Sequence, residues 1–330
     1  VLEVIQRPTL TGHQYTDENN FQMYYIGNDR FAHMEFARRL DLTFAESSAG
    51  RDRFLTITPR INTDLIVVEI FRRTALRWRE HGYLIVPRWV YSSIDLRVPE
   101  RKRLNKNRRS MVAHLEASAL NYQVREDDAA FELFYDRMYL PTIESLFAER
   151  GYKVRRRYMR HLAKHGWFVF VHDEKGPIAG GLVVRIHGLG RWLDFRALGI
   201  INGSRSHVNA REAIYLFVLR WAERWGANTL GLGASYPFLT DGGLRHKKRW
   251  GAVVYRDVRD PFCLAVAARS DEAVERLSHL GLIFEDMNGD LRALGQGGIS
   301  TVRSIPGVVS IESPQKETSL VAWFRKCARC

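Results

Sequence analysis

Residues 210–225 (AREAIYLFVLRWAERW) constrain the fold more than any other segment of this chain. The segment has the length of a helix and is apolar on almost every side, whereas a helix at a protein surface keeps a polar face. We therefore expect this helix to be buried against a β-sheet. Asn209, with Glu212 three residues later, predicts the helix N-cap, and Gly226 predicts its end.

The segments around this helix alternate between helix-like and strand-like patterns. Residues 127–147 and 152–164 predict two helices, the first interrupted at Pro141. Strands are predicted at residues 167–172, 178–186, 191–197 and 228–234. The order helix, helix, three antiparallel strands, helix, strand is typical of an α/β protein.

The rest of the chain carries weaker patterns. Strands are predicted at residues 54–58, 64–68 and 83–86, and helices at 70–80, 101–119 and 271–280. The chain has 330 residues, of which 45% are hydrophobic, so it is long and apolar enough to form two domains with real cores.

Basic residues outnumber acidic residues by 50 to 37, which gives a formal net charge of +13. Three clusters without an acidic residue hold sixteen of the basic residues, at 101–109, 150–160 and 245–250. Such clustering favours an anionic ligand over a merely solvated surface. The first cluster lies at the N-terminal end of a predicted helix, where the helix dipole disfavours cations and an anion would relieve the misfit.

The three cysteines, Cys263, Cys327 and Cys330, are too few for a disulfide framework and favour a reducing, cytoplasmic compartment. Cys327 and Cys330 lack the two further ligands that a zinc site needs, so no metal is predicted. No run of ~18 apolar residues predicts a transmembrane helix, and residues 1–14 do not have the pattern of a secretory signal. We therefore expect a soluble protein.

Several stretches, in this order, resemble the transferase domain of FemAB-type proteins, which is similar to GNAT acyltransferases. They are FELFYDRMYLPTI at 131–143, WFVFVHDEKGPIAGGLVV at 167–184 and GASYPFLTDGGLRHKKRWGA at 233–252. In the last stretch, Lys247-x-x-Trp250-Gly251 resembles the family signature F-K-x-x-F-G, with His246 and Trp250 in the aromatic positions.

The resemblance implies an α/β fold with tandem GNAT-like domains, each a mixed, mostly antiparallel sheet flanked by helices. A degenerate N-terminal domain is expected at residues 1–119 and the transferase domain at 120–260. Residues 261–330 form a C-terminal extension of unknown packing. The chain shows no counterpart of the coiled-coil arm of some cell-wall members, so we expect a small-molecule amine as acceptor in place of a peptidoglycan precursor.

The implied reaction is attack of an amine on an activated carbonyl, which needs an oxyanion stabiliser and a proton acceptor. Lys247 is the first candidate, as a contact to anionic groups or to the carbonyl, although a solvated loop lysine is the plain alternative. Asp241 would orient or deprotonate the amine, or it is ordinary Asp-Gly-Gly turn chemistry. Ser235 and Tyr236 would donate hydrogen bonds to a carbonyl. Trp250 would form a wall of the site, and Gly251 would form a tight turn.

Asp194 and Arg196 share one side of a predicted strand, as substrate contacts or as a mutual ion pair. No H-E-x-x-H, G-x-S-x-G or phosphate-loop motif occurs, so we expect no cofactor and a donor that arrives already activated.

The resemblance implies two possible donors. Residues 200–210 lack the G-x-G of an acyl-CoA pyrophosphate loop, which weakens the acyl-CoA alternative. Aminoacyl-tRNA fits the basic clusters better, because contacts to tRNA are mainly contacts to phosphates. A catalytically inactive RNA-binding module is the remaining alternative. The residues expected to bind tRNA or another phosphate are Arg101, Lys102, Arg103, Lys106, Arg108, Arg109, Arg155, Arg156, Arg157, Arg205, Lys248 and Arg249.

Overall fold

The computed structural model describes residues 11–49, 63–147, 153–186, 191–201, 207–257, 260–286 and 288–294. The chain divides into two compact units. Unit 1 contains Val1–Val90, Ser235–Leu244 and Val254–Cys330, and unit 2 contains Tyr91–Ala234 and Arg245–Val253. The chain thus crosses between the units four times.

The boundaries of these units differ from those of the expected domains. Residues 91–119 belong to unit 2, and the described part of 261–294 belongs to unit 1. The physical reason is strand pairing between distant segments: Phe262–Ala268 pairs with Leu65–Phe71 on one side and with Leu84–Pro87 on the other.

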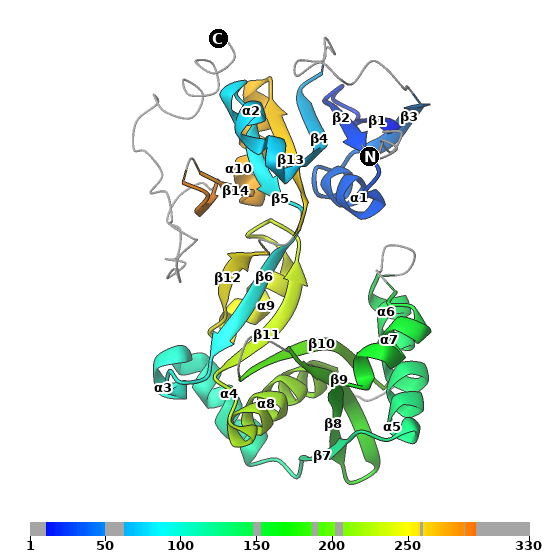
Figure 1. The fold of residues 1–330 in the computed structure, drawn as a ribbon, viewed down its shortest axis with the longest axis vertical. Coiled ribbons are helices and arrows are strands. Elements are labelled where there is room, and N and C mark those ends of the chain that lie inside the picture. Colours follow the sequence, from blue (N-terminus) through cyan, green and yellow to red (C-terminus); the bar gives the residue numbers. More distant parts are fainter. Residues whose placement is uncertain are drawn as a thin grey trace, which may run out of the picture. The chain divides into compact units, whose positions relative to one another are not determined.

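An eight-stranded mixed sheet forms the centre of unit 1 (Figure 1). Its strands in spatial order are β15 (Leu291–Ala293), β14 (Ile283–Glu285), β5 (Leu84–Pro87), β13 (Phe262–Ala268), β4 (Leu65–Phe71), β2 (Gln22–Gly27), β1 (Thr11–Thr16) and β3 (Thr43–Ala49). Its helices are α1 (Arg30–Arg39), the 3₁₀ turn η2 (Arg72–Thr74), α2 (Ala75–Glu80) and α10 (Asp271–Leu280).

Both faces of this sheet are covered. Leu65 and Val67 of β4 pack in the cluster that contains Phe36 of α1 and Leu277 of α10. Ile66 and Val68 point to the opposite face, where α2 packs. The uninterrupted apolar run of β4 is therefore explained by burial on both sides.

A seven-stranded mixed sheet forms the centre of unit 2, although Val90, Ser235 and residues 254–256 of its strands are assigned to unit 1. Its strands in spatial order are β12 (Val253–Arg256), β6 (Val90–Asp95), β11 (Thr229–Ser235), β10 (Trp192–Ile200), β9 (Gly176–Arg185), β8 (Gly166–Asp173) and β7 (Asn121–Arg125). Its helices are α3 (Glu100–Arg103), α4 (Lys106–Glu116), α5 (Asp128–Glu132), the π-helix η3 (Leu133–Tyr139), α6 (Leu140–Phe147), α7 (Arg156–Ala163), α8 (His207–Trp225) and α9 (Gly242–Arg249).

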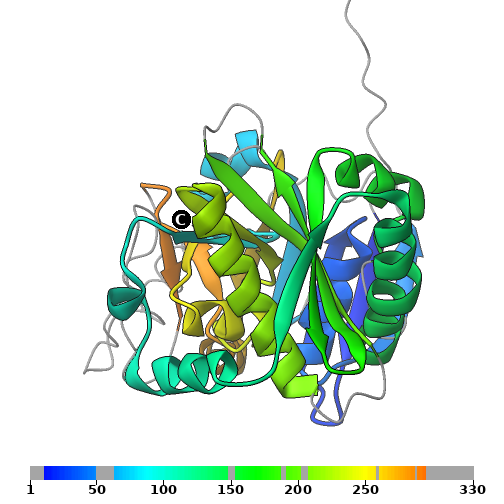
Figure 2. The same cartoon turned by 90° about the horizontal axis from the view of Figure 1, so that it is seen from below.

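Helix α8 and the segment α5–α7 cover opposite faces of this sheet (Figures 1 and 2). Strand β8 shows the alternation directly: Val169 and Val171 pack on the α8 side, and Phe168 and Phe170 pack on the η3 side. The predicted burial of the apolar helix against a sheet is confirmed. The expected class, α/β with two mixed, mostly antiparallel sheets flanked by helices, is confirmed as well.

Several predicted elements differ in detail. The helix predicted at 101–119 is two helices, α3 and α4, because the Asn105 side chain accepts from the Arg108 N–H and starts a new helix. The helix predicted at 127–147 continues through Pro141, which lies in the first turn of α6, where a missing N–H is tolerated. No strand was predicted at β1, β2, β3, β6, β7 or β12, and none was given bounds in the segment that contains β13, β14 and β15.

Other predictions shift by a few residues. Helix α8 begins at His207, so Asn209 lies within its first turn. The helix predicted at 70–80 begins only after β4 ends at Phe71. The strand predicted at 54–58 lies outside the described residues. None of the described helices is long and apolar enough to cross a membrane.

Candidate functional site

Strands β10 and β11 run parallel but pair over only part of their length. The register contains three pairs, from Trp192 with Thr229 to Asp194 with Gly231. Just after Asp194, strand β10 bulges at Arg196, because Phe195 pairs with Val183 of β9 and Ala197 pairs with Leu182. Bulges of this kind redirect a strand and are frequent beside active sites. Beyond this point β10 stays with β9 up to Ile200, whereas its registered pairing with β11 has ended.

The peptide groups of β10 beyond the bulge can be assigned to its two edges. The Ile201 N–H donates to the Ile178 carbonyl of β9 at 2.9 Å. Because such groups alternate along an antiparallel strand, the peptide groups of Leu198 and Ile200 point away from β9, toward the side on which β11 lies. We call this parting of the two strands the β10–β11 split.

Lys247 of α9 binds the end of β11. Its Nζ donates to the carbonyl oxygens of Gly233 at 3.1 Å and Ala234 at 2.6 Å, and its side chain is buried. Gly233 has φ +70°, a left-handed conformation that favours glycine and takes the strand out of regular pairing. Lys247 therefore fixes the backbone at the split, and the predicted contact to an anionic substrate stays a prediction.

Glu212, in the first turns of α8, holds the C-terminal half of α9. Its Oε2 accepts from Arg108 of α4 and from the Trp250 Nε1 at 3.1 Å, and its Oε1 lies 3.7 Å from the His246 Nδ1. The Arg108 guanidinium also lies over the Trp250 ring, 4.9 Å from its centroid. Trp250 is thus a fully buried core residue, and Arg108 is a buried ion-pair partner. Neither side chain is exposed at the surface for a ligand to contact.

The electrostatics of this cluster act on His246. Burial, together with the positive charges of Arg108, Arg211 and Arg249, lowers the pKa of His246 to about 4. Its Nε2 is buried without a hydrogen-bond partner among the described residues. His246 is therefore neutral at physiological pH.

Asp194 and Arg196 lie at the start of the split. Arg196 Nε and Asp194 Oδ2 are 3.1 Å apart, so the ion-pair alternative is the one the structure shows. Gly231 of β11 faces the same carboxylate, because a Cβ there would lie 2.7 Å from Asp194 Oδ1. Arg196 is the bulge residue and keeps about a third of its side chain exposed.

Three predicted site residues belong to unit 1: Ser235, Tyr236 and Asp241. The two Asp241 oxygens are engaged, Oδ2 by Arg39 Nη2 at 2.8 Å and Oδ1 by the Leu244 N–H at 2.7 Å, so Asp241 caps α9. Tyr236 stacks near Trp89, with ring centroids 4.7 Å apart, and burial raises its pKa to about 12. Ser235 is buried. The proposed catalytic roles of these three residues remain predictions.

The first basic cluster separates into internal and exposed members. Arg103 pairs with Glu223 and Arg108 pairs with Glu212, and both side chains are buried. The exposed members have no ion pair to another described residue. They are Arg101, Lys102, Lys106 and Arg109. We call these four side chains the α3–α4 basic face.

The second cluster is largely neutralised. Arg156 pairs with Glu132 and Asp136, and Arg160 pairs with Asp128 and Glu132. Arg155 and Arg157 are exposed. In the third cluster, burial lowers the pKa of Lys248, and Arg249 is exposed. Arg205, the remaining predicted phosphate contact, lies outside the described residues.

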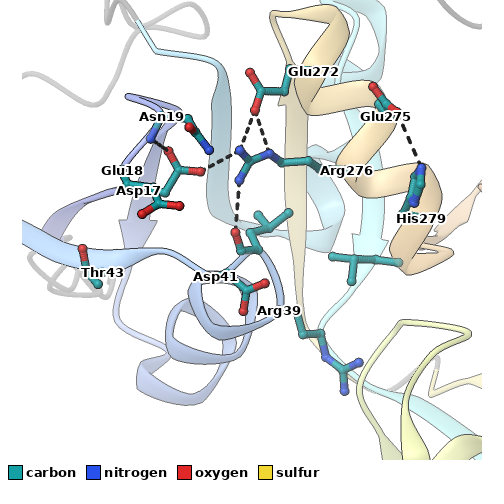
Figure 3. A pocket seen from close by; sticks show the side chains of 12 residues that line it. Asp17, Glu18, Asn19, Arg39, Asp41, Thr43, Glu272, Glu275, Arg276 and His279 are labelled. Carbon is teal, nitrogen blue, oxygen red and sulfur yellow. Dashed lines mark hydrogen bonds and ion pairs between the residues drawn. The ribbon is translucent and has the colours of Figure 1, made fainter.

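Unit 1 contains a cavity of about 820 Å³ between the β1–β2 turn, the end of α1 and α10 (Figure 3). Arg276 is at its centre and pairs with Asp17 at 2.6 Å and with Glu272 at 2.5 Å. None of the predicted site residues lines it. Among the described residues, no group of three or more His, Cys, Asp or Glu side chains is arranged to hold a metal ion.

Glu212 and Arg39 were missed at the level of sequence. A signal existed for Glu212, which is an acidic residue near the start of an otherwise apolar helix and therefore needs a partner. For Arg39 no local signal existed, because its partner Asp241 is 202 residues away.

No family model matches the chain, and no curated protein matches it. Solved structures of similar fold include FemX, at 11% identity and a TM-score of 0.42, over 74% of this chain and 80% of that one. Another is L-PGS from Bacillus licheniformis, at 11% identity and a TM-score of 0.40, over 81% and 84% of the two chains. A tandem GNAT protein from the clavulanic acid biosynthesis pathway has 12% identity and a TM-score of 0.35, over 74% of each chain. These likenesses are too distant to transfer an activity or a residue role.

Proposed function

We propose that unit 2 is an acyltransferase that moves an acyl group from an activated donor to an amine, forming an amide. The observation that carries this proposal is the β10–β11 split. The peptide N–H and C=O of Leu198 face it, so an extended donor can bind along β10 as an added strand would.

The proposed reaction needs few catalytic groups. The amine nitrogen attacks the carbonyl carbon of the donor ester and forms the C–N bond. The bond between that carbon and the ester oxygen breaks, and the proton that the nitrogen loses is taken up by the departing oxygen, which leaves as a hydroxyl group. Peptide N–H groups fixed beside the split would stabilise the oxyanion that develops. Lys247 supports this function by holding the backbone of Gly233 and Ala234.

We further propose that the donor is aminoacyl-tRNA and that the acceptor is a small-molecule amine. The α3–α4 basic face supports this donor, because its four exposed cations have no acidic partner among the described residues. Arg109 donates from Nη1 to the carbonyl oxygens of Arg101 and Leu104, so Arg101, Lys102 and Lys106 are the members best placed to contact phosphates. The α7 cluster supports it less, because acidic side chains of α5 and η3 occupy Arg156 and Arg160.

The test is amide formation by the purified protein, followed by mass spectrometry, with mixed aminoacyl-tRNA or acyl-CoA as donor and a panel of small amines as acceptors. The triple variant Arg101→Ala, Lys102→Ala, Lys106→Ala should raise the KM for aminoacyl-tRNA about tenfold or more near 0.15 M salt. The slope of log KM against log salt should fall by about 2–3, one phosphate contact per side chain. The matched comparison is Arg155→Ala with Arg157→Ala against Arg101→Ala with Lys102→Ala, because each pair removes two exposed charges. The α7 pair should have the smaller effect, because carboxylates of α5 and η3 lie beside α7 and weaken the attraction of that surface for phosphates.

Each outcome separates the candidate functions. Turnover with acyl-CoA alone, unchanged in the triple variant, would replace the proposed donor. Salt-dependent tRNA binding without turnover of any donor would identify an RNA-binding module and reject the transferase.

A further inference from the structure

Thr142 of α6 binds the last residue of β10. Its Oγ1 donates to the Ile200 carbonyl oxygen at 3.2 Å and accepts from the Ile200 N–H at 2.7 Å. The Thr142 side chain is buried, 6% exposed. One hydroxyl group therefore satisfies both peptide groups of Ile200.

These two peptide groups are the ones that point toward the β10–β11 split. Ile201 bonds to β9, so Ile200 directs its N–H and C=O to the other edge of the strand. In a fully paired sheet, the neighbouring parallel strand would satisfy them. Here a side chain from a helix takes the place of the neighbouring strand.

Two glycines allow that helix to approach. A Cβ on Gly199 would lie 2.4 Å from the backbone of Met138 and Tyr139, and a Cβ on Gly180 would lie 2.8 Å from the Met138 Sδ. Gly180 and Gly199 are cross-strand partners. Because neither has a side chain, the π-helix η3 can pack close to the backbone of the sheet at this point. The position of Thr142 is set by this close packing one turn earlier.

We propose that Thr142 is a positioning residue that holds the end of β10 apart from β11. This proposal rests on the proposed function of unit 2. It adds a residue that keeps the ends of β10 and β11 apart. Thr142 binds both peptide groups of Ile200. The peptide groups of Leu198 are therefore the last ones of β10 that can bind the donor. The donor-binding edge of β10 therefore has a defined end.

The test compares Thr142→Val, which keeps the shape and removes the hydroxyl group, with Thr142→Ser, which keeps the hydroxyl group. Amide hydrogen exchange should be at least about tenfold faster at Ile200 in the Val variant, with the Ser variant close to wild type. The KM for the donor should rise about tenfold or more in the Val variant while kcat changes less, and the Ser variant should restore it. Circular dichroism verifies folding, and Thr142→Ala replaces the Val variant if that variant does not fold.

The two proposals fail in different ways. If the wild-type protein turns over no donor, the proposed function falls, and the exchange data still show whether Thr142 holds Ile200. If the wild-type protein is active and the Val variant exchanges faster with an unchanged donor KM, the hydroxyl group is merely structural and the positioning role is rejected. Unchanged exchange in the Val variant would reject the hydrogen bonds themselves.

Discussion

The two units each contain a parallel strand pair followed by a helix, and they treat the end of that pair differently. In unit 1, β2 and β4 pair from Met23 with Leu65 to Ile26 with Val68. The Glu69 carboxylate then reaches across the end of the pair and accepts from the N–H groups of Asn28 and Asp29, at 2.8 and 3.1 Å. In unit 2, the ends of β10 and β11 are bound separately, by Thr142 and by Lys247.

The difference shows which pair is suited to an anionic donor. The N–H groups before α1 already have a carboxylate acceptor, and Arg88 sits among Asp29, Glu69 and Asp260, where it neutralises only part of their charge. A phosphate would be repelled there. The split in unit 2 carries no such carboxylate bridge among the described residues, so the same strand arrangement is closed in one unit and open in the other.

The largest expected effect comes from glycines at the two pairs. In Gly199→Ala the new Cβ meets backbone atoms of Met138 and Tyr139 that cannot move independently, so we expect a loss of about 3 kcal/mol or more in the free energy of unfolding. In Gly27→Ala the new Cβ meets one atom that is fixed to the backbone, the Glu69 Cβ at 2.6 Å, and side-chain atoms of Glu69 and Tyr25 at 2.9 Å. These contacts are longer than the two backbone contacts at Gly199, so we expect a smaller loss of about 2 kcal/mol. Urea unfolding measures both.

Gly242→Ala is the control, because nothing lies within 4 Å of its added Cβ. It should change stability by less than about 1 kcal/mol. Equal losses at Gly199 and Gly27 would contradict the ranking of the two sites by the closeness of their contacts.

A smaller effect is expected from arginines that hold a carboxylate in each unit. Arg108→Met leaves Glu212 without its cation and should cost about 2–3 kcal/mol, because that carboxylate is mostly buried. Arg39→Met should cost less, about 1–2 kcal/mol. In that variant Asp241 still accepts a hydrogen bond from the Leu244 N–H, and Glu35 still pairs with Arg38. The measurement is again urea unfolding, and a larger loss for Arg39→Met would reverse our ranking of the two ion pairs.

An effect of similar size is expected as a pH dependence of unit 2 through His246. Its pKa falls from 6.5 to about 4 on folding. Between these two pH values His246 is protonated in the unfolded chain and neutral in the folded chain. Stability should therefore decrease as the pH falls from about 6.5 to about 4, by on the order of 2 kcal/mol. His246→Phe should remove this part of the profile, and an unchanged profile in that variant would assign the acid sensitivity to other groups.

Local patterns predicted much of unit 2. Strands β8 to β11 and helix α8 match their predicted segments to within a few residues, because alternation and an all-apolar helix are local signals. The tight turn expected at Gly251 is confirmed by its φ of +82°, with Arg103 packed against it. Strands β1 and β2 escaped prediction, because polar residues such as His13, Gln14 and Gln22 interrupt their apolar pattern.

The candidate site was predicted less completely. The motif singled out Lys247 as a contact to anionic groups, and that role stays a prediction. In the structure Lys247 donates to backbone carbonyls of Gly233 and Ala234, which a side-chain motif cannot reveal. The basic clusters at 101–109 and 150–160 look alike in sequence. Only the fold shows that the second lies against acidic side chains of α5 and η3.

The amino-acid sequence by itself determined strands β8 to β11, helix α8 with its burial, and the excess of positive charge, because each can be read without long-range contacts. Only the tertiary structure shows that each unit is built from separate segments of the chain. It also shows that Glu69 bridges the end of the β2–β4 pair and that β10 separates from β11. These depend on contacts such as Thr142 with Ile200 and Arg39 with Asp241, across 58 and 202 residues. Strand register and side-chain partners at such separations are fixed only when the whole sheet packs, since no local pattern encodes them.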